Sequence, residues 1–233
     1  MIKKIFLFFL ILVNNDILCS QKDHTPLLNC KKKAESILRE IICKPSLSDQ
    51  KTIMRKIINE LINEKQDLDK EYKYSKYTNF PLKQAIEFDD EESVTLLIKN
   101  GANVNIKVNE ANNTLLFTAI YNGNLTIIKL LIEAGININT RGYYGDTALV
   151  RAITTNYNST VAIVNFLLDK GADPNIKNDE GDTALISAIE VCTFGSNRAR
   201  IKQIIKALIF HGADLNFINT DGESLMKIAK KSS

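Results

Sequence analysis

The stretch Thr114-Leu-Leu-Phe-Thr-Ala-Ile-Tyr-Asn-Gly-Asn-Leu-Thr-Ile-Ile-Lys-Leu-Leu-Ile-Glu-Ala-Gly-Ile-Asn-Ile-Asn139 decides the fold of this 233-residue chain. It holds two short apolar runs with helical spacing, separated by Asn-Gly-Asn and closed by a second glycine. The pattern recurs, and its corresponding alanines are Ala85, Ala119, Ala152, Ala188 and Ala229, at intervals of 34, 33, 36 and 41 residues. A period near 33 residues with helical patterning predicts an all-α solenoid of stacked helix pairs.

Residue types at fixed places in each unit have a local physical role. Threonine stands at three expected helix starts, where its hydroxyl can accept a hydrogen bond from an unpaired backbone N–H. These residues are Thr114, Thr147 and Thr183. Leucine pairs such as Leu130-Leu131 are expected to fill the layer between units. Glycines such as Gly135 follow the second helix, where a left-handed residue ends a helix at little cost.

These stretches closely resemble ankyrin repeats, whose family pattern is Thr-Pro-Leu-His-x-Ala, then Gly, then Val-x-x-Leu-Leu, then Gly-Ala-Asp-x-Asn. The opening of the pattern matches residues 80–85, 147–152 and 183–188, and its end matches residues 101–105, 171–175 and 212–216. The family histidine is replaced by Lys83, Phe117, Val150, Ile186 and Met226. The resemblance implies an ankyrin-repeat solenoid of helix–turn–helix units with β-hairpin-like loops.

Three parts are expected along the chain: residues 1–20 as a signal peptide, 21–79 as an N-terminal helical segment, and 80–233 as repeats. The repeats divide into 80–113, 114–146, 147–182, 183–223 and a partial unit 224–233. Apolar residues at helical spacing over 28–42 and 53–62 predict two amphipathic helices in the N-terminal segment. This segment either caps the first repeat, as solenoid ends require, or forms a second binding site. Residues 65–79 are predicted to be a polar helix end and connector.

The N-terminus has the pattern of a secretory signal peptide. Lys3 and Lys4 precede nine apolar residues, 5–13, and a polar stretch then leads to Ser20. Nine apolar residues are too few for a membrane span, which needs about 20. We therefore expect cleavage near residue 20 and a secreted protein with no stable membrane span. A short N-terminal anchor or a buried helix is the alternative.

Cysteine usage bears on the destination of the protein. Cleavage would leave Cys30, Cys43 and Cys192, an odd number with no pair at disulfide spacing along a helix. An exported protein free of disulfides fits a reducing compartment. Delivery into a host cell by an intracellular bacterium is a hypothesis that fits both observations.

Composition and motifs argue against catalysis and nucleic-acid binding. The net charge of +3 is too weak to indicate nucleic acid as the main ligand. The chain has no His-x-x-x-His, Cys-x-x-Cys or glycine-rich phosphate loop, so no catalytic, cofactor-binding or metal-binding residue is predicted. His211 is expected to have a structural role at a helix C-terminus.

Ankyrin-like arrays bind partners with their hairpin tips and inner helices, and the resemblance places these positions by register. The predicted partner-binding residues are Glu110, Asn113, Tyr121, Tyr143, Tyr144, Asp146, Asp179, Glu180, Asp182, Asp221 and Glu223. The ends of the inner helices add Phe88, Asn122, Thr154, Thr155 and Glu190. An acidic row with two tyrosines predicts that the partner is an unknown protein with a basic or amphipathic segment. The chain itself is expected to be a monomer. Simply solvated, charged tips are the alternative.

The predicted function is therefore an exported protein–protein interaction module, with a host-directed effector as its sharper form. One alternative is an intracellular scaffold whose residues 1–20 are not cleaved. Another is an enzyme with an unrecognised site in the N-terminal segment. Two long loops, 156–160 and 191–200, either carry binding or reflect neutral drift.

Overall fold

A computed structural model describes residues 47–63, 68–69, 72–74, 77–108, 112–155, 160–194, 198–216 and 227. The chain divides into two compact units, residues 1–103 and 104–233. The predicted signal peptide, the first predicted N-terminal helix and nearly all of the partial unit 224–233 lie outside the described residues.

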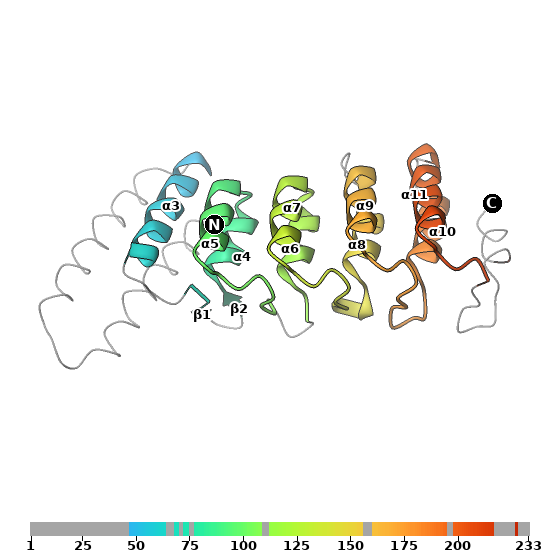
Figure 1. Ribbon diagram of the computed structural model, residues 1–233, viewed down its shortest axis with the longest axis horizontal. Helices are drawn as coiled ribbons and strands as arrows, with labels where there is room; N and C mark the ends of the chain where they lie inside the picture. Colours follow the sequence, from blue (N-terminus) through green and yellow to red (C-terminus); the bar gives the residue numbers. More distant parts are fainter. Residues whose placement is uncertain are drawn as a thin grey trace, which may run out of the picture. The chain divides into compact units, whose positions relative to one another are not determined.

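The first unit contains three described helices (Figure 1). Helix α3 (Leu47–Asn63) confirms the predicted second N-terminal helix, because Met54, Ile58 and Leu61 recur at helical spacing and are buried. Helices α4 (Pro81–Glu87) and α5 (Glu91–Lys99) form the first predicted pair, and α3 packs against α5.

A short antiparallel strand pair stands where the sequence predicted a polar helix end and connector. Strand β1 (Tyr72–Tyr74) pairs with β2 (Tyr77–Asn79), with Tyr74 opposite Tyr77. The prediction was wrong for these residues, because a segment this rich in tyrosine favours extended backbone over helix.

An ion pair between half-exposed Arg55 of α3 and buried Asp90, the residue before α5, joins these two helices. The Arg55 guanidinium donates from Nη2 to Asp90 Oδ1 at 2.7 Å and from Nε to Asp90 Oδ2 at 3.0 Å. The Ser93 hydroxyl also donates to Asp90 Oδ2, at 2.7 Å. Burial raises the pKa of Asp90, but the hydrogen bonds from Arg55 and Ser93 outweigh it and hold the pKa below its usual value of 3.8. The pair therefore keeps a buried carboxylate charged at the start of α5.

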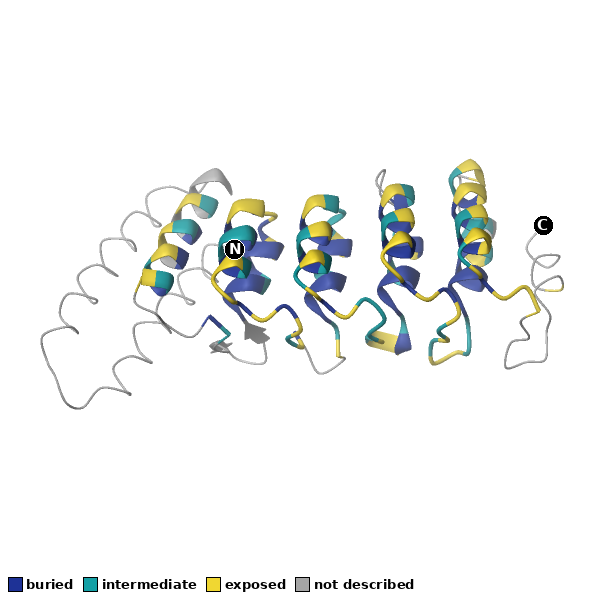
Figure 2. Ribbon diagram, in the orientation of Figure 1, coloured by how far each residue is buried: buried dark blue, intermediate teal, exposed yellow. Residues whose placement is uncertain are grey.

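The second unit contains three helix pairs in succession (Figure 1). They are α6 (Leu115–Asn122) with α7 (Leu125–Glu133), α8 (Ala148–Thr154) with α9 (Thr160–Asp169), and α10 (Ala184–Phe194) with α11 (Arg198–Phe210). The inner helices α6, α8 and α10 pack side by side, as do the outer helices α7, α9 and α11. Ala119, Ala152 and Ala188 are 0% exposed, and their small side chains let neighbouring helices approach closely. Figure 2 shows buried residues concentrated where these helices face one another.

The predicted long loop over 191–200 is mostly helical. Helix α10 extends to Phe194, and α11 begins at Arg198 and runs for 13 residues, against nine and ten for α7 and α9. Apolar residues continue the helical pattern of α10, and Arg, Ala and Lys favour helix at the start of α11. Most of the predicted loop at 156–160 lies outside the described residues.

The threonine caps are only partly as predicted. Thr147 accepts a hydrogen bond from the Val150 N–H at 3.4 Å. Within the described part of the chain, the Oγ1 atoms of Thr114 and Thr183 are buried without a hydrogen-bond partner. At Thr114 the reason is local, because its own carbonyl accepts the Phe117 N–H at 3.1 Å. An unpredicted cap is Asn124, whose Oδ1 accepts the Ile127 N–H at 3.0 Å at the start of α7.

In the second compact unit, an asparagine in the turn after the outer helix of each repeat joins that turn to the turn of the next repeat. Asn139 accepts the Asp173 N–H at 2.9 Å and donates to the Gly171 carbonyl at 3.2 Å. Asn105 makes the same two bonds to Asn137 and Gly135, and Asn175 makes them to Asp214 and Gly212. The sequence predicted only that asparagine suits a tight turn. In the structure, each of these side chains links its turn to the next one.

Replacing Asn139 by alanine should lower the free energy of unfolding by about 1–2 kcal/mol, since two exposed hydrogen bonds between turns are lost. Urea denaturation of the full chain measures this change. Thr126→Ala, on the exposed side of α7, is the control. A loss for Asn139→Ala no larger than that of the control would contradict the linking role.

Candidate partner-binding surface

The inner helices of the second unit present one exposed row. Tyr121, Thr154 and Glu190 occupy the same register position in α6, α8 and α10, and all three are exposed. Tyr121 stands out, because 69% of its surface is accessible. Asn122 and Thr155, the next position in the register, are half-buried.

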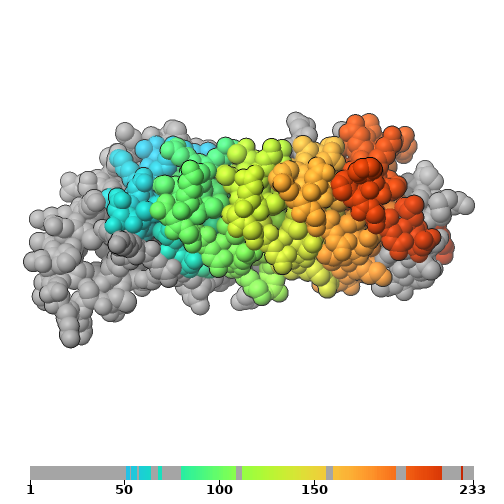
Figure 3. All heavy atoms as spheres, viewed as in Figure 1, coloured from blue at the N-terminus to red at the C-terminus, as the bar shows by residue number. Residues whose placement is uncertain are grey.

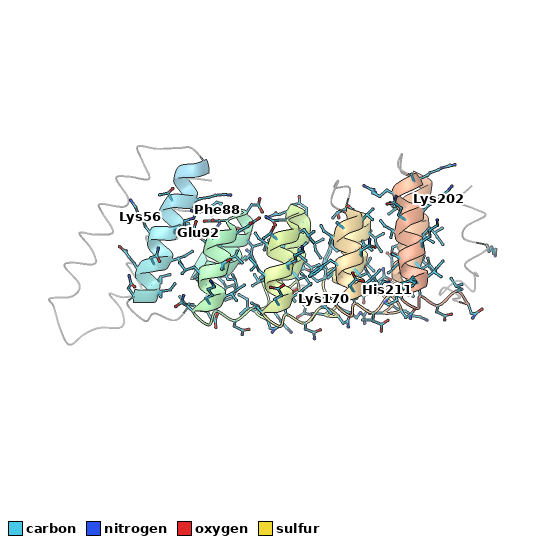
Figure 4. The ribbon with its side chains drawn as sticks, turned by 45° about the horizontal axis from the view of Figure 1, so that its top comes forward. Lys56, Phe88, Glu92, Lys170, Lys202 and His211 are labelled. Carbon is cyan, nitrogen blue, oxygen red and sulfur yellow. The ribbon has the colours of Figure 1, made fainter. Side chains whose placement is uncertain are left out.

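Phe88, predicted as a partner contact in the first unit, was wrongly assigned. Only 6% of its surface is accessible, and it lies directly after α4 (Figure 4). A phenylalanine ring stabilises the folded chain more when it is buried in the apolar core than when it is in water. The Phe88 side chain therefore packs in the core and does not contact a partner.

The tips between the helix pairs are closed by one recurring backbone hydrogen bond. The N–H groups of Val108, Gly142 and Asn178 donate to the carbonyls of Asn113, Asp146 and Asp182, at 2.8–2.9 Å. This confirms the predicted hairpin-like loops. Neighbouring tips are also joined, because the Tyr143 N–H donates to Asn113 Oδ1 at 3.0 Å. The Asp179 N–H donates to the Tyr144 carbonyl at 2.9 Å.

Tyr143 and Tyr144 form a pair at the middle tip. Their ring centroids lie 3.9 Å apart, and the two hydroxyl groups form a hydrogen bond with 2.9 Å between their oxygens. Both rings remain in solvent, with 47% and 60% of their surfaces accessible. Tyr144 has φ 56° and ψ 22°, a left-handed conformation that is unfavourable for a residue with a Cβ atom. Strained backbone of this kind is common where a side chain must be presented to a ligand.

The two glycines beside this pair hold the tip in shape. A Cβ atom on Gly142 would lie 2.5 Å from Asn113 Oδ1 and 2.9 Å from Phe117 Cζ. Gly145 has φ 71°, and a Cβ atom there would collide with the Arg141 guanidinium and with Asp179. Only glycine therefore fits at position 145, whereas a side chain at position 142 would require Asn113 and Phe117 to shift. No local sequence signal gave this constraint.

Part of the predicted acidic row is neutralised within the chain. Asp179 pairs with Arg141 at 2.6 Å, and Asp146 pairs with Arg151 at 3.3 Å. Asp146 also accepts a hydrogen bond from Asn178 Nδ2 at 3.2 Å. The Asp146 side chain therefore joins neighbouring tips. The Asn113 side chain does the same, because it accepts a hydrogen bond from the Tyr143 N–H.

Negative charge concentrates around Glu190 of α10. Glu190 is exposed overall, but its carboxyl group is partly shielded from water. This partial burial is the largest cause that raises its pKa, and the charges of Asp182 and Glu180 raise it further. The charge of Glu180 also acts on Tyr144 of the tyrosine pair. The hydrogen bond with Tyr143 is the main cause that raises the pKa of Tyr144 above 10.0, and the charge of Glu180 adds to it.

Three predicted tip residues, Glu110, Asp221 and Glu223, lie outside the described residues. In the part of the chain that is described, no three His, Cys, Asp or Glu side chains gather closely enough to hold a metal ion. None of the described helices is long and apolar enough to cross a membrane. His211 lies after α11, with Nδ1 2.9 Å from the Ala207 carbonyl and Nε2 3.3 Å from Asp169 Oδ1, in keeping with its expected structural role.

Comparison with known proteins agrees with these observations. Residues 82–178 match the family model for ankyrin repeats, in three copies. The chain is also 38% identical over 81 residues to "Transient receptor potential cation channel subfamily A member 1" of Homo sapiens. That alignment covers 34% of this chain and 7% of the human protein, so the chain spans a small part of its relative's length. Residues 82–178 are therefore ankyrin repeats, and the chain carries an all-α ankyrin-repeat solenoid, a module for protein–protein interaction.

Proposed function

We propose that the second unit binds a basic or amphipathic segment of another protein through its tip surface, defined here as Tyr121, Tyr143, Tyr144, Glu180, Asp182 and Glu190. The observation that carries this proposal is the exposed, hydrogen-bonded tyrosine pair, of which Tyr144 has a left-handed backbone. The backbone of both residues joins neighbouring tips, but their exposed rings add nothing to the core, so both rings are available to a ligand.

The chemistry of the tip surface fits a cationic ligand. Tyrosine gives a large contact area at low entropic cost and can accept a lysine or arginine over its ring face. Burial is the largest cause that raises the pKa of Glu190, and repulsion by the charges of Asp182 and Glu180 adds to it. A partner lysine or arginine placed among them would relieve that repulsion. Ankyrin-repeat domains are typically non-catalytic, and we propose no reaction for this chain.

We further propose that the protein is exported, and that its partner belongs to a host cell. The support is the N-terminal sequence, with Lys3 and Lys4 before nine apolar residues and Ser20 after them. N-terminal sequencing of the native protein tests export. A mature chain that starts near residue 21 is expected, whereas one that starts at residue 1 or 2 would favour the intracellular scaffold.

The three carboxylates of Glu180, Asp182 and Glu190, called here the charge cluster, allow a prediction that can be tested without the partner protein. Because the folded-state pKa of Glu190 is raised, the folded state binds its proton more tightly than the unfolded chain does. Ionised Glu190 is therefore unfavourable at neutral pH, and this cost disappears as pH falls through the raised pKa. Glu190→Gln should stabilise the chain at pH 7 by less than about 1 kcal/mol, since solvent screens an exposed carboxylate.

Urea denaturation at a series of pH values measures this effect. The gain from Glu190→Gln should shrink as pH falls, because the wild-type carboxyl becomes protonated and neutral too. Glu133→Gln, an exposed carboxylate on α7, is the matched control. An equal, pH-independent change in both variants would rule out the charge cluster.

A further inference from the structure

Helix α11 differs from the other outer helices in its charge. It carries Arg198, Arg200, Lys202 and Lys206, and no acidic residue occurs from 198 to 213. By contrast, α7 carries Lys129 and Glu133, and α9 ends at Asp169 beside Lys170. Positive charge on the outer helices is therefore concentrated on α11, while its partner helix α10 carries Glu190 of the tip surface.

The exposed residues of α11 form a stripe along one side of the helix. Lys202, Lys206 and Phe210 are spaced four residues apart, so they share one face, and all three are exposed. Ile201, Ile204 and Leu208 are buried against the rest of the unit. The helix therefore exposes its basic residues to solvent. Figure 2 marks exposed residues along α11, and Figure 3 shows atoms of the same segment at the surface. Lys202 lies near the start of α11, and His211 lies beyond its end (Figure 4).

Phe210 is an unusual residue for its place. The same register position in the earlier repeats holds a charged residue each time: Lys99, Glu133 and Asp169. The Phe210 side chain is 85% exposed, and its described ring contact is an edge-on approach to His211 at 5.2 Å. A large apolar ring here adds nothing to the core of the repeat, so it is available to a ligand.

We infer that this stripe, Arg198, Lys202, Lys206 and Phe210, docks on the anionic phospholipid surface of a membrane. Lysines at headgroup level with an aromatic ring at one end are the arrangement by which peripheral helices bind charged bilayers. An acidic protein is a less favourable ligand, because lysine is depleted from protein–protein interfaces. This interaction goes beyond the proposed function, since it uses a different surface and leaves the tyrosine pair accessible for a protein partner.

Vesicle co-sedimentation of the full chain tests this inference. Binding is expected to vesicles of phosphatidylcholine with about 30% phosphatidylserine, and not to phosphatidylcholine alone. Lys202→Gln with Lys206→Gln should weaken binding about 25-fold, or about fivefold for each charge. The control, Lys99→Gln with Lys107→Gln, makes the same change in net charge at two other exposed lysines and should bind like the wild type. Phe210→Ser should weaken binding about tenfold without changing its dependence on salt.

Raising the salt concentration tests the same claim on the wild-type protein, and binding should fall steeply. The inference is overturned if anionic vesicles are not bound, or if the two lysine pairs have equal effects. It is also overturned if immobilised polyglutamate retains the chain through Lys202 and Lys206 while vesicles do not, because the ligand is then an acidic protein. Thermal melts of each variant confirm that the exposed substitutions leave the fold intact.

Discussion

Replacing Tyr143 and Tyr144 together by alanine should abolish capture of the protein partner, with affinity falling roughly a hundredfold or more. Exposed aromatic residues that become buried at the centre of an interface carry most of its binding energy. The thermal melt should stay close to that of the wild type, because 47% and 60% of the two side chains are accessible in the free chain. Affinity capture from a candidate host lysate, followed by titration of the captured protein, measures the loss.

Tyr144→Gly separates binding from folding more sharply. Glycine adopts φ 56° without the clash that a Cβ atom causes, so this variant should melt no lower than the wild type and still lose the partner. Phe210→Ser is the matched control, since it removes an exposed aromatic residue outside the tip surface. Undiminished capture by the tyrosine double variant would eliminate the tip surface as the binding site.

The second large effect is expected in the first unit, where Arg55→Ala should lower the free energy of unfolding by about 2–3 kcal/mol. Removing one partner of a buried ion pair leaves the other charge uncompensated, at a cost of about 3–5 kcal/mol. Asp90 is 1% exposed, but 38% of the Arg55 side chain is accessible, so we expect a value below that range. Urea denaturation measures the loss, with Asn59→Ala on the exposed side of α3 as the control.

The pH dependence gives a second readout of this ion pair. Because the folded-state pKa of Asp90 is depressed, the pair stabilises the chain above pH 3.8, and this contribution is lost as pH falls through the depressed value. Without Arg55, burial is opposed by fewer hydrogen bonds, so the folded-state pKa of Asp90 rises towards or above its unfolded value. The acid-induced loss of stability that this carboxyl contributes should therefore shrink or reverse in Arg55→Ala. A pH profile of Arg55→Ala parallel to that of the wild type would contradict this account.

The helix pairs could be predicted from the sequence because their signal is local. Apolar residues recur at helical spacing within each unit, and Gly135 adopts φ 85° at the predicted end of α7. The tip positions followed from the same register, and the structure places Tyr143, Tyr144 and Glu180 in solvent there. A pattern that repeats four times leaves little freedom in where each helix begins and ends.

The contacts that the sequence could not predict join residues far apart in the chain. Arg55 and Asp90 are separated by 35 positions, and Asn139 and Asp173 by 34. Nothing in a local window shows which carboxylate a given arginine will meet. Phe88 was misplaced for a related reason, because its exposure depends on the residues packed around it. The longer α11 was missed because extra residues between two helices can form either a loop or an added helical turn.

The most direct test of the tip surface is hydrogen–deuterium exchange of the full chain, alone and with its captured partner. Amide protection should increase at residues 141–146 and 178–182, the two tips that carry the tyrosine pair and the carboxylates. Helices α7, α9 and α11 should show no comparable change. Protection confined to these outer helices, with both tips exchanging as in the free chain, would contradict the claim that the tip surface binds the partner.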